Sequence, residues 1–272
     1  MNHKPTIKMK EKAMSEVDRE YLYKSFKELK LKHFPEVVEK GLRDQEPKFQ
    51  SQTVHLLKRC CEKEKAERRT NQIATRIKSA KFGQVQMASD FDFKHSKMTQ
   101  RIENTYLAIH NNIDKKNLPK AIFVGNPGVG KTHLARSLGY ASCQKGLTVL
   151  FITAAAMANQ LIQAQKLATL DKEIARLKKP QVLIIDELGY VDFDTQGGQL
   201  FFQVISARHD AGLGLVVTTN LNFSQFNQIF SNEAVATVVV DRMVNEAEIF
   251  YMEGESYRKH QRAMKIKADK KA

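Results

Sequence analysis

The 272-residue sequence predicts an α/β fold, in which helices flank a parallel sheet and a helical region precedes it. From residue 119 onward, short aliphatic and β-branched runs alternate with longer helical segments, as in parallel strands joined by crossover helices. One run, residues 182–185, has four consecutive apolar residues, which is typical of a strand buried on both faces. Before residue 119, strand signals are scarce, which favours the preceding helical region.

Helical patterns dominate the N-terminal part of the chain. Ser15 and Asp18 form a capping box before a segment whose apolar residues fall near helical spacing. Residues 51–82 are rich in Lys, Arg and Glu with few helix breakers, and they predict a long, largely solvated helix. Its charges either pair along the helix surface or leave basic side chains free for nucleic acid. The basic candidates are Arg68, Arg69, Arg76, Lys78 and Lys81.

Five strands and the helices between them are predicted in the second part of the chain, after a loop at 111–119. The strands are expected at 121–125, 147–152, 181–186, 213–220 and 248–252. Helices are expected at 131–146, 155–178 and 197–212, with further helical sequence before the last strand. The sequence contains no internal repeat and no low-complexity linker.

A phosphate-binding loop follows the first predicted strand. The sequence GNPGVGKTH matches the pattern of a glycine, four residues and Gly-Lys-Thr in the required strand–loop–helix context. Glycines let backbone N–H groups approach phosphate oxygens, and the helix N-terminus adds partial positive charge. Lys131 is expected to reach the terminal phosphates, and the Thr132 hydroxyl to ligate Mg²⁺. The predicted nucleotide-binding residues are Gly125, Asn126, Pro127, Gly128, Val129, Gly130, Lys131, Thr132 and His133.

Polar residues end two further strands. Asp186, at the end of a neighbouring buried strand, is expected to hold Mg²⁺ and its hydration shell together with Thr132, because the carboxyl ends of the strands form the ligand crevice of open α/β sheets. Glu187 is expected to orient and deprotonate the water that attacks the γ-phosphate. Asn220, at the same edge, is expected to hydrogen-bond that water or the γ-phosphate. Taken singly, Asp186 and Asn220 also suit turns, and the phosphate loop favours the catalytic interpretation.

The charge balance points to polyanionic partners. A formal net charge of +14 and a pI of 9.6 support sequence-independent contacts with phosphates, so nucleic acid is the expected partner, although a basic protein can also simply be soluble. Residues 257–272 carry seven Lys or Arg against one Asp and predict a basic tail that lies along a phosphate backbone.

The cysteines and the hydropathy of the sequence indicate where in the cell the protein is expected. Cys60, Cys61 and Cys143 are odd in number and lack metal-ligand spacing, so they are predicted to be reduced and structural, with Cys60 and Cys61 on different faces of a helix. No segment approaches the roughly 18 apolar residues of a membrane span, and the N-terminal sequence lacks the apolar core of a signal peptide. A cytoplasmic location is therefore expected.

Taken together, the motifs resemble those of the IstB family of AAA+ proteins, the helper ATPases of insertion-sequence transposons, which are similar to DnaC helicase loaders. The resemblance runs from about residue 68 to residue 261. It is carried by AKFGQVQMASDFDF, GNPGVGKTHLARSLG, VLIIDELGY, LFFQVISARHD, TTNL, DRM and GESYR. One departure is ARHD, in which His209 stands where the family usually shows an aromatic residue before the acid.

The resemblance implies a P-loop AAA+ fold without the usual C-terminal helical lid. It also implies an ATP-dependent homo-oligomer that binds duplex DNA without strong sequence preference and helps a transposase select its target. Arg242 would then be an arginine finger acting across the subunit interface, whereas its local pattern beside Asp241 is that of a surface residue.

Two alternatives remain open at this stage. One is a helicase loader, an ATP-gated adaptor whose N-terminal helices grip another protein. The other is a module that uses ATP only for assembly, against which Glu187 argues. The expected organisation is an N-terminal helical domain at 1–67, a helical connector with a basic helix at 68–118, an ATPase domain at 119–258 and a basic tail at 259–272.

Overall fold

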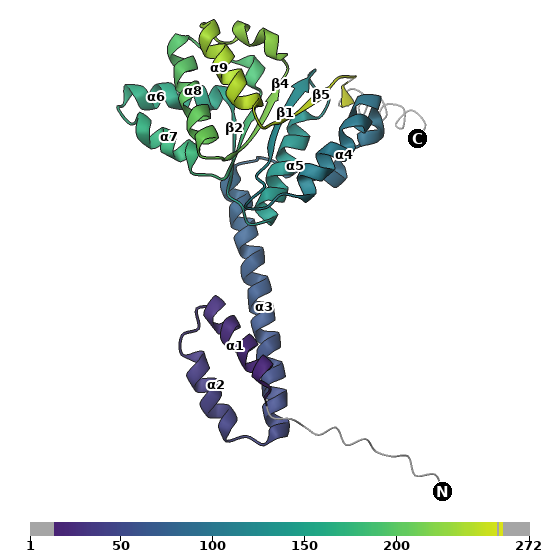
Figure 1. Ribbon diagram of the computed structural model, residues 1–272, viewed down its shortest axis with the longest axis vertical. Helices are drawn as coiled ribbons and strands as arrows, with labels where there is room; N and C mark the ends of the chain where they lie inside the picture. The colour runs from purple at the N-terminus through teal and green to yellow at the C-terminus, as the bar shows by residue number, and fades with distance from the viewer. Residues whose placement is uncertain (1–13, 255, 258–272) are drawn as a thin grey trace, which may run out of the picture. The chain divides into compact units, whose positions relative to one another are not determined.

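The computed structural model describes residues 14–254 and 256–257 (Figure 1). The chain divides into two compact units, Met1–Gln72 and Ile73–Ala272, which are described one at a time. The predicted basic tail at 259–272 lies outside the described residues. Within the described part of the chain, none of the helices combines the length and apolar composition needed to cross a membrane.

The first unit is helical, as predicted. It contains α1 (Glu16–Glu28), α2 (Phe34–Arg43) and the first part of α3 (Pro47–Ala80). Ser15 caps α1 by accepting a hydrogen bond of 3.1 Å from the backbone N–H of Asp18, which confirms the predicted helix start. The core of the first unit consists of Leu22, Phe26, Leu29, Leu42, Val54 and Cys61.

The three cysteines are free, and the neighbours on α3 face opposite ways. Cys61 is buried in the core of the first unit, whereas Cys60 is exposed. Cys143 is buried in the second unit, where burial raises the pKa of its thiol to about 11. Burial also raises the pKa of the Cys61 thiol. Both buried thiols therefore stay protonated near neutral pH, in agreement with the predicted structural role.

The second unit is built on a five-stranded parallel sheet, which confirms the predicted fold class. The strand order is β2-β3-β4-β1-β5, and every pair is parallel. The strand that ends at Asp186 is not the direct neighbour of the strand before the phosphate loop, because β4 lies between them. The strands are β1 (Lys120–Gly125), β2 (Val149–Thr153), β3 (Val182–Asp186), β4 (Gly214–Thr219) and β5 (Glu248–Met252).

Helices cover both faces of the sheet (Figure 1). On one face lie α6 (Ala154–Lys166), α7 (Leu170–Lys178), α8 (Thr195–Asp210) and α9 (Glu233–Val244), and on the other lie α4 (Lys97–Asn111) and α5 (Lys131–Gln144). Along β3, Leu183 and Ile185 pack in the core beneath α6 to α9, whereas Val182 and Ile184 pack in the core beneath α4 and α5. This alternation explains the continuous apolar run of β3, because both of its faces are buried. Short 3₁₀ helices complete the unit at Ala88–Asp90, Phe93–His95, Leu188–Tyr190 and Phe223–Gln228.

The prediction of one helix at 155–178 is wrong, because the chain turns between α6 and α7. Ala168 adopts a left-handed conformation with φ of 53°, and the N–H of Thr169 reaches back to the carbonyl of Ala164 at 2.8 Å. If α6 continued as a straight helix, its buried face would next include positions near 168, 171 and 175. The residues of α7 that pack in the core are instead Leu170, Ile174 and Leu177, so they lie on a different face of such a helix. A straight helix could not bury both stripes, so a break without Gly or Pro separates them.

A buried arginine ties the start of two strands to the end of α7. Arg208 is fully buried, and its Nη1 donates to the carbonyls of Leu177 at 2.8 Å and Pro180 at 3.0 Å. Its Nη2 donates to the carbonyls of Gly214 at 2.6 Å and Gln181 at 3.4 Å. Burial lowers the pKa of Arg208 to about 10, so the guanidinium still carries its charge near neutral pH.

We expect Arg208→Met to lower the free energy of unfolding by about 3 kcal/mol, because it leaves several buried carbonyls without a donor. Urea denaturation followed by circular dichroism measures the change. The matched control is Arg176→Met, which removes a partly exposed pair with Glu173 and should cost less than about 1 kcal/mol. Equal losses in the two variants would contradict a clamping role for Arg208.

Candidate active site

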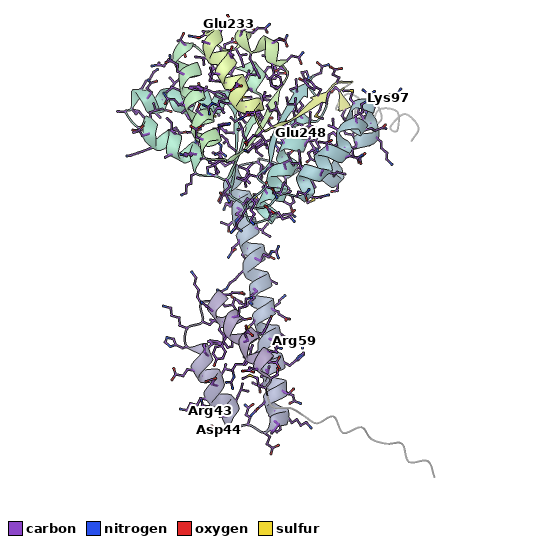
Figure 2. The ribbon with its side chains drawn as sticks, in the orientation of Figure 1. Arg43, Asp44, Arg59, Lys97, Glu233 and Glu248 are labelled. Atoms are coloured by element: carbon purple, nitrogen blue, oxygen red, sulfur yellow. The ribbon has the colours of Figure 1, made fainter. Side chains whose placement is uncertain are left out.

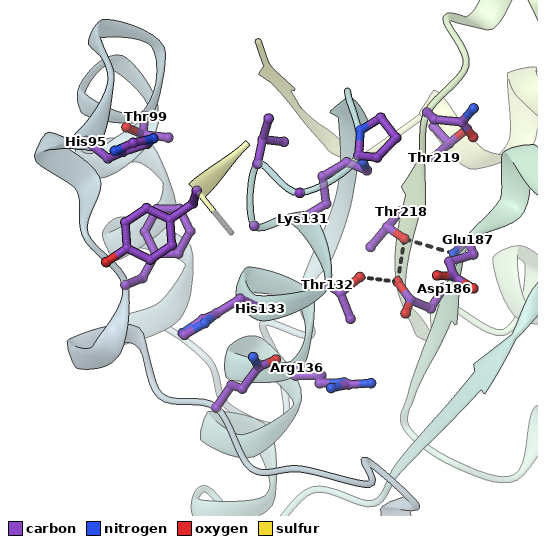
Figure 3. A pocket seen from close by; sticks show the side chains of 18 of the residues that line it. His95, Thr99, Lys131, Thr132, His133, Arg136, Asp186, Glu187, Thr218 and Thr219 are labelled. Atoms are coloured by element: carbon purple, nitrogen blue, oxygen red, sulfur yellow. Dashed lines mark hydrogen bonds between the residues drawn. The ribbon is translucent and has the colours of Figure 1, made fainter. Parts of the chain in front are cut away.

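A cavity of about 590 Å³ lies at the carboxyl ends of β1, β3 and β4 (Figure 3). Of the residues predicted from the sequence, those that line it are Pro127, Gly128, Val129, Gly130, Lys131, Thr132, His133, Asp186, Glu187 and Asn220. Gly125 and Asn126 belong to the same loop without lining the cavity, and Arg242 lies elsewhere. The parallel strands thus bring together three sequence segments that are far apart in the chain.

The loop at 125–130 can form only with glycine at particular positions. A Cβ on Gly125 would lie 1.9 Å from the carbonyl oxygen of Met252, because β5 passes directly beside the loop. Gly130 has φ of 101°, and a Cβ there would lie 2.4 Å from the ring of Phe91. Gly130 immediately precedes α5, so the first N–H groups of that helix and their partial positive charge lie at the cavity.

Lys131 is held beside the loop. Its Nζ donates hydrogen bonds to the carbonyl oxygens of Gly125 at 2.7 Å and Asn126 at 2.9 Å. The ammonium group and the N-terminus of α5 therefore concentrate positive charge at one end of the cavity. An anionic phosphate chain is the chemical group that such an end binds.

One buried carboxylate connects three elements of the site (Figure 3). Asp186 Oδ1 accepts hydrogen bonds from Thr132 Oγ1 of α5 at 2.9 Å and from Thr218 Oγ1 of β4 at 2.5 Å. The Thr218 hydroxyl oxygen in turn accepts a hydrogen bond of 2.9 Å from the backbone N–H of Glu187. Thr218 was not among the predicted site residues, and its signal is the pair of threonines, Thr218 and Thr219, that ends a buried strand.

Glu187 has an unusual backbone conformation. Its φ of 62° and ψ of 41° lie in the left-handed region, which is unfavourable for a residue with a Cβ. The side chain is exposed and lines the cavity, next to the buried Asp186. Strain of this kind is typical of functional sites, because the surrounding contacts must hold the residue in place.

Asn220 contributes a polar atom that no described residue satisfies. Its Oδ1 is buried and, within the described part of the chain, has no hydrogen-bond partner. The amide lies against Gly189, where a Cβ would approach that oxygen to 2.1 Å. Gly189 therefore makes room for Asn220, and it is a second residue that the sequence analysis missed although it stands in the DELGY motif. A buried acceptor without a partner, in a residue that lines a cavity, is typical of functional sites.

Aromatic side chains form a wall of the cavity other than the one that carries Asp186 and Glu187. Phe91 packs edge-on against His133, with ring centroids 5.4 Å apart, and His133 Nε2 lies 2.8 Å from the carbonyl oxygen of Met87. His95 and Tyr257 also meet edge-on at 4.9 Å and line the same cavity. Because aromatic faces stack on planar rings, this wall suits a nucleotide base. Of these four residues, only His133 was predicted from the sequence to bind the nucleotide.

Comparisons of the sequence with known proteins agree with this geometry. A family model described as IstB-like ATP binding protein matches residues 24–265. The ATP-binding protein of insertion sequence IS5376 from Geobacillus stearothermophilus is 34% identical over 215 residues, which cover 79% of this chain and 84% of that protein. The ATP-binding protein of insertion sequence IS21 from Pseudomonas aeruginosa is 29% identical over 230 residues, which cover 85% of each chain.

Solved structures share the fold. The DnaC helicase loader aligns with a TM-score of 0.52 and 21% identity, covering 58% of this chain and 91% of that chain. DnaA from Aquifex aeolicus, bound to AMPPCP, aligns with a TM-score of 0.53 and 14% identity, covering 67% of this chain and 55% of that chain. At such identities the similarity establishes the AAA+ fold alone, which confirms the predicted architecture.

We expect Lys131→Ala to weaken ATP binding by a factor of about 10 to 100, because it removes a charge-assisted contact to phosphate. Titration with a fluorescent ATP analogue measures the affinity. Lys145→Ala is the control, since Lys145 is an exposed cation at the other end of the same helix. Equal affinities for the Lys131→Ala and Lys145→Ala proteins would contradict phosphate binding at this loop.

Proposed function

The chain belongs to the family of IstB-like ATP-binding proteins, and we propose that it is a Mg²⁺-dependent ATPase that assembles on duplex DNA and assists a transposase in target selection. The observation that carries the proposal is the convergence of Lys131, Thr132, Asp186 and Glu187 on one cavity. The transposase is proposed because the relatives at 34% and 29% identity are ATP-binding proteins of insertion sequences.

The oxygen atoms around Asp186 fit a magnesium ion. Thr132 Oγ1 and Asp186 Oδ1 lie 2.9 Å apart at the phosphate end of the cavity, and both are hard ligands of the kind that Mg²⁺ prefers. Of the side chains that the structure describes, no three or more His, Cys, Asp or Glu form a metal cluster. This donor set suits Mg²⁺, which keeps several waters and takes phosphate oxygens as ligands. When bound, the ion would neutralise charge on the phosphate oxygens.

Glu187 is the residue that we propose as the general base. Its exposed carboxylate lines the cavity, where it can accept a proton from water as that water attacks the γ-phosphate. The hydrogen bond from its backbone N–H to Thr218 fixes its position relative to Asp186. Asn220 lines the same cavity, and we propose that its side-chain amide hydrogen-bonds the attacking water.

Arg242 is proposed to act in a neighbouring subunit. It belongs to α9 and lines a small pocket together with Lys120, which is the first residue of β1. The phosphate loop lies at the other end of β1. A six-residue strand spans roughly 20 Å, so this arginine is too far away to serve the nucleotide site of its own chain. A second copy could supply it to stabilise charge on the transferring phosphoryl group.

The basic side chains of α3 divide into two groups, which refines the proposed DNA contact. Lys58 pairs with Asp18, and Lys65 pairs with Glu28 at 2.6 Å, so these cations hold the first unit together. Arg68 is likewise engaged, because it donates to Glu64 at 2.7 Å and to the carbonyl of Leu29 at 2.9 Å.

A second group of cations on α3 is exposed and remains available for phosphates. For the described part of the chain, no ion pair or hydrogen bond engages Arg59, Lys63 or Arg69. Figure 2 shows Arg59 projecting from α3 on the side away from α1 and α2. We propose that these three residues, together with the basic tail at 259–272, neutralise phosphates of duplex DNA without reading its sequence.

The Glu187→Gln protein should bind Mg²⁺-ATP with an affinity within about twofold of the unaltered protein while its turnover falls by a factor of about 10² to 10⁴, since only the base is removed. A coupled phosphate-release assay, run with and without duplex DNA, measures turnover. The loss should be the same in both conditions. Near-normal hydrolysis by this variant would overturn the assignment of Glu187, and the absence of hydrolysis by the unaltered protein would favour an assembly module instead.

Replacing Arg59, Lys63 and Arg69 with Gln should weaken duplex binding for all sequences alike. The slope of log affinity against log salt should become shallower by about 2 to 3, because each neutralised phosphate contributes about 0.9. Fluorescence anisotropy over a salt series, with ATP present, measures this slope. Arg68→Gln is the matched control, and it should leave the slope nearly unchanged because its charge is held within the first unit. A shallower slope for Arg68→Gln than for the triple variant would refute the division of the α3 cations into a group held within the first unit and a group available for phosphates.

A further inference from the structure

The guanidinium of Arg242 is held by two residues at the end of α8. Its Nη1 lies 3.0 Å from Nδ1 of His209 and 3.0 Å from Oδ1 of Asp210. Nη1 carries two hydrogens, so it can donate one to each partner. His209, which the sequence analysis left without a role, thus contacts the arginine directly.

The contact with His209 has a defined direction. Arginine only donates hydrogen bonds, so Nδ1 of His209 is the acceptor for Nη1 of Arg242. The other ring nitrogen, Nε2, lies 3.0 Å from Nδ2 of Asn245. Arg242, His209 and Asn245 therefore lie in one row between α8 and the end of α9.

The two contacts of Arg242 differ in how well water is excluded from them. Asp210 alone is a weak anchor because its side chain is 65% exposed and therefore screened by water. The side chain of His209 is only 25% exposed, so its contact with Arg242 is the better shielded one.

One side of the guanidinium is left for another molecule. Within the part of the chain that the structure describes, the hydrogen bonds of Arg242 all use Nη1, so Nη2 and Nε stay available as donors. The group lies at the amino-terminal edge of the sheet, opposite the edge that carries the phosphate loop. Head-to-tail assembly brings these two unlike edges of neighbouring copies together, because such an interface joins different surfaces of identical subunits.

We propose that His209, with Asp210, is a positioning residue that fixes Arg242 for use at the nucleotide site of a neighbouring copy of this chain. The inference rests on the proposed function, because it assumes that Arg242 acts on ATP bound by another subunit. In this role His209 contacts neither ATP nor the reacting water. It holds Nη1 of the guanidinium, which leaves Nη2 and Nε as donors for another molecule.

Mixed assemblies test this role separately from catalysis within one subunit. Glu187→Gln subunits supply Arg242 but cannot hydrolyse ATP, and Arg242→Ala subunits keep Glu187 but lack the arginine. A one-to-one mixture should recover ATP turnover that neither protein shows alone. His209→Phe is then added to either partner, since it keeps a ring of similar size while removing the acceptor.

The effect of His209→Phe should depend on which partner carries it. In the arginine-supplying Glu187→Gln subunit it should lower the recovered turnover by about tenfold, as expected for losing a hydrogen bond to a charged group. In the Arg242→Ala subunit the same change should have little effect, because that subunit supplies no arginine. Equal effects in both partners, or none in either, would overturn the positioning role while leaving the proposed function intact. A mixture that assembles but recovers no turnover would overturn both.

Rescue by a second variant gives an independent readout. His209→Asn places a carbonyl oxygen where Nδ1 stands, so it keeps an acceptor for Arg242 that His209→Phe removes. In the arginine-supplying subunit it should keep turnover within about twofold of the original mixture. A loss as large as that caused by His209→Phe would overturn the role of this hydrogen bond.

Discussion

The carboxylate of Asp186 is the constraint on which the rest of the site depends. It is buried, and two hydroxyl groups from other elements donate to it, one from α5 and one from β4. A buried charge is stable only when its hydrogen bonds are satisfied, so the three elements must meet at one point. The strand order β3-β4-β1 makes this possible, because it places the ends of three parallel strands at the same edge. The phosphate loop, the acids and the polar end of β4 are then fixed relative to one another.

Much of this arrangement could be predicted from local sequence. The apolar run before Asp186, the glycine pattern around Lys131 and the alternation of strands and helices each have a local physical cause. Thr218 and Gly189 were missed because their roles depend on which strands lie side by side: β4 enters between β1 and β3, and Asn220 then packs on Gly189. The break after α6 was missed for another reason. No Gly or Pro marks it, and its signal is a shift in the phase of the buried residues.

The basic residues of this chain differ in their roles, and the net charge alone cannot reveal these differences. Neighbouring arginines on α3 differ in use, since Arg68 is tied to Glu64 and Leu29 whereas Arg69 is exposed. The end of α8 shows a similar contrast. Arg208 is buried among carbonyl groups and holds the sheet together, and the next residue, His209, holds another arginine at the edge of the unit. Basic residues with a structural role and basic residues for which we propose a functional role thus lie one residue apart, and only their contacts distinguish them.

The left-handed backbone of Glu187 has a consequence for how this chain would change over generations. A residue with a Cβ loses about 1 kcal/mol or more in that conformation, whereas glycine adopts it freely. If Glu187 is the general base, as we propose, selection for catalysis opposes selection for stability at this one position. In a copy of the gene that no longer needs hydrolysis, glycine, or to a lesser degree asparagine, would replace the glutamate with a gain in stability. The identity of residue 187 in degenerate copies would then record whether catalysis was lost early, while the surrounding fold persisted.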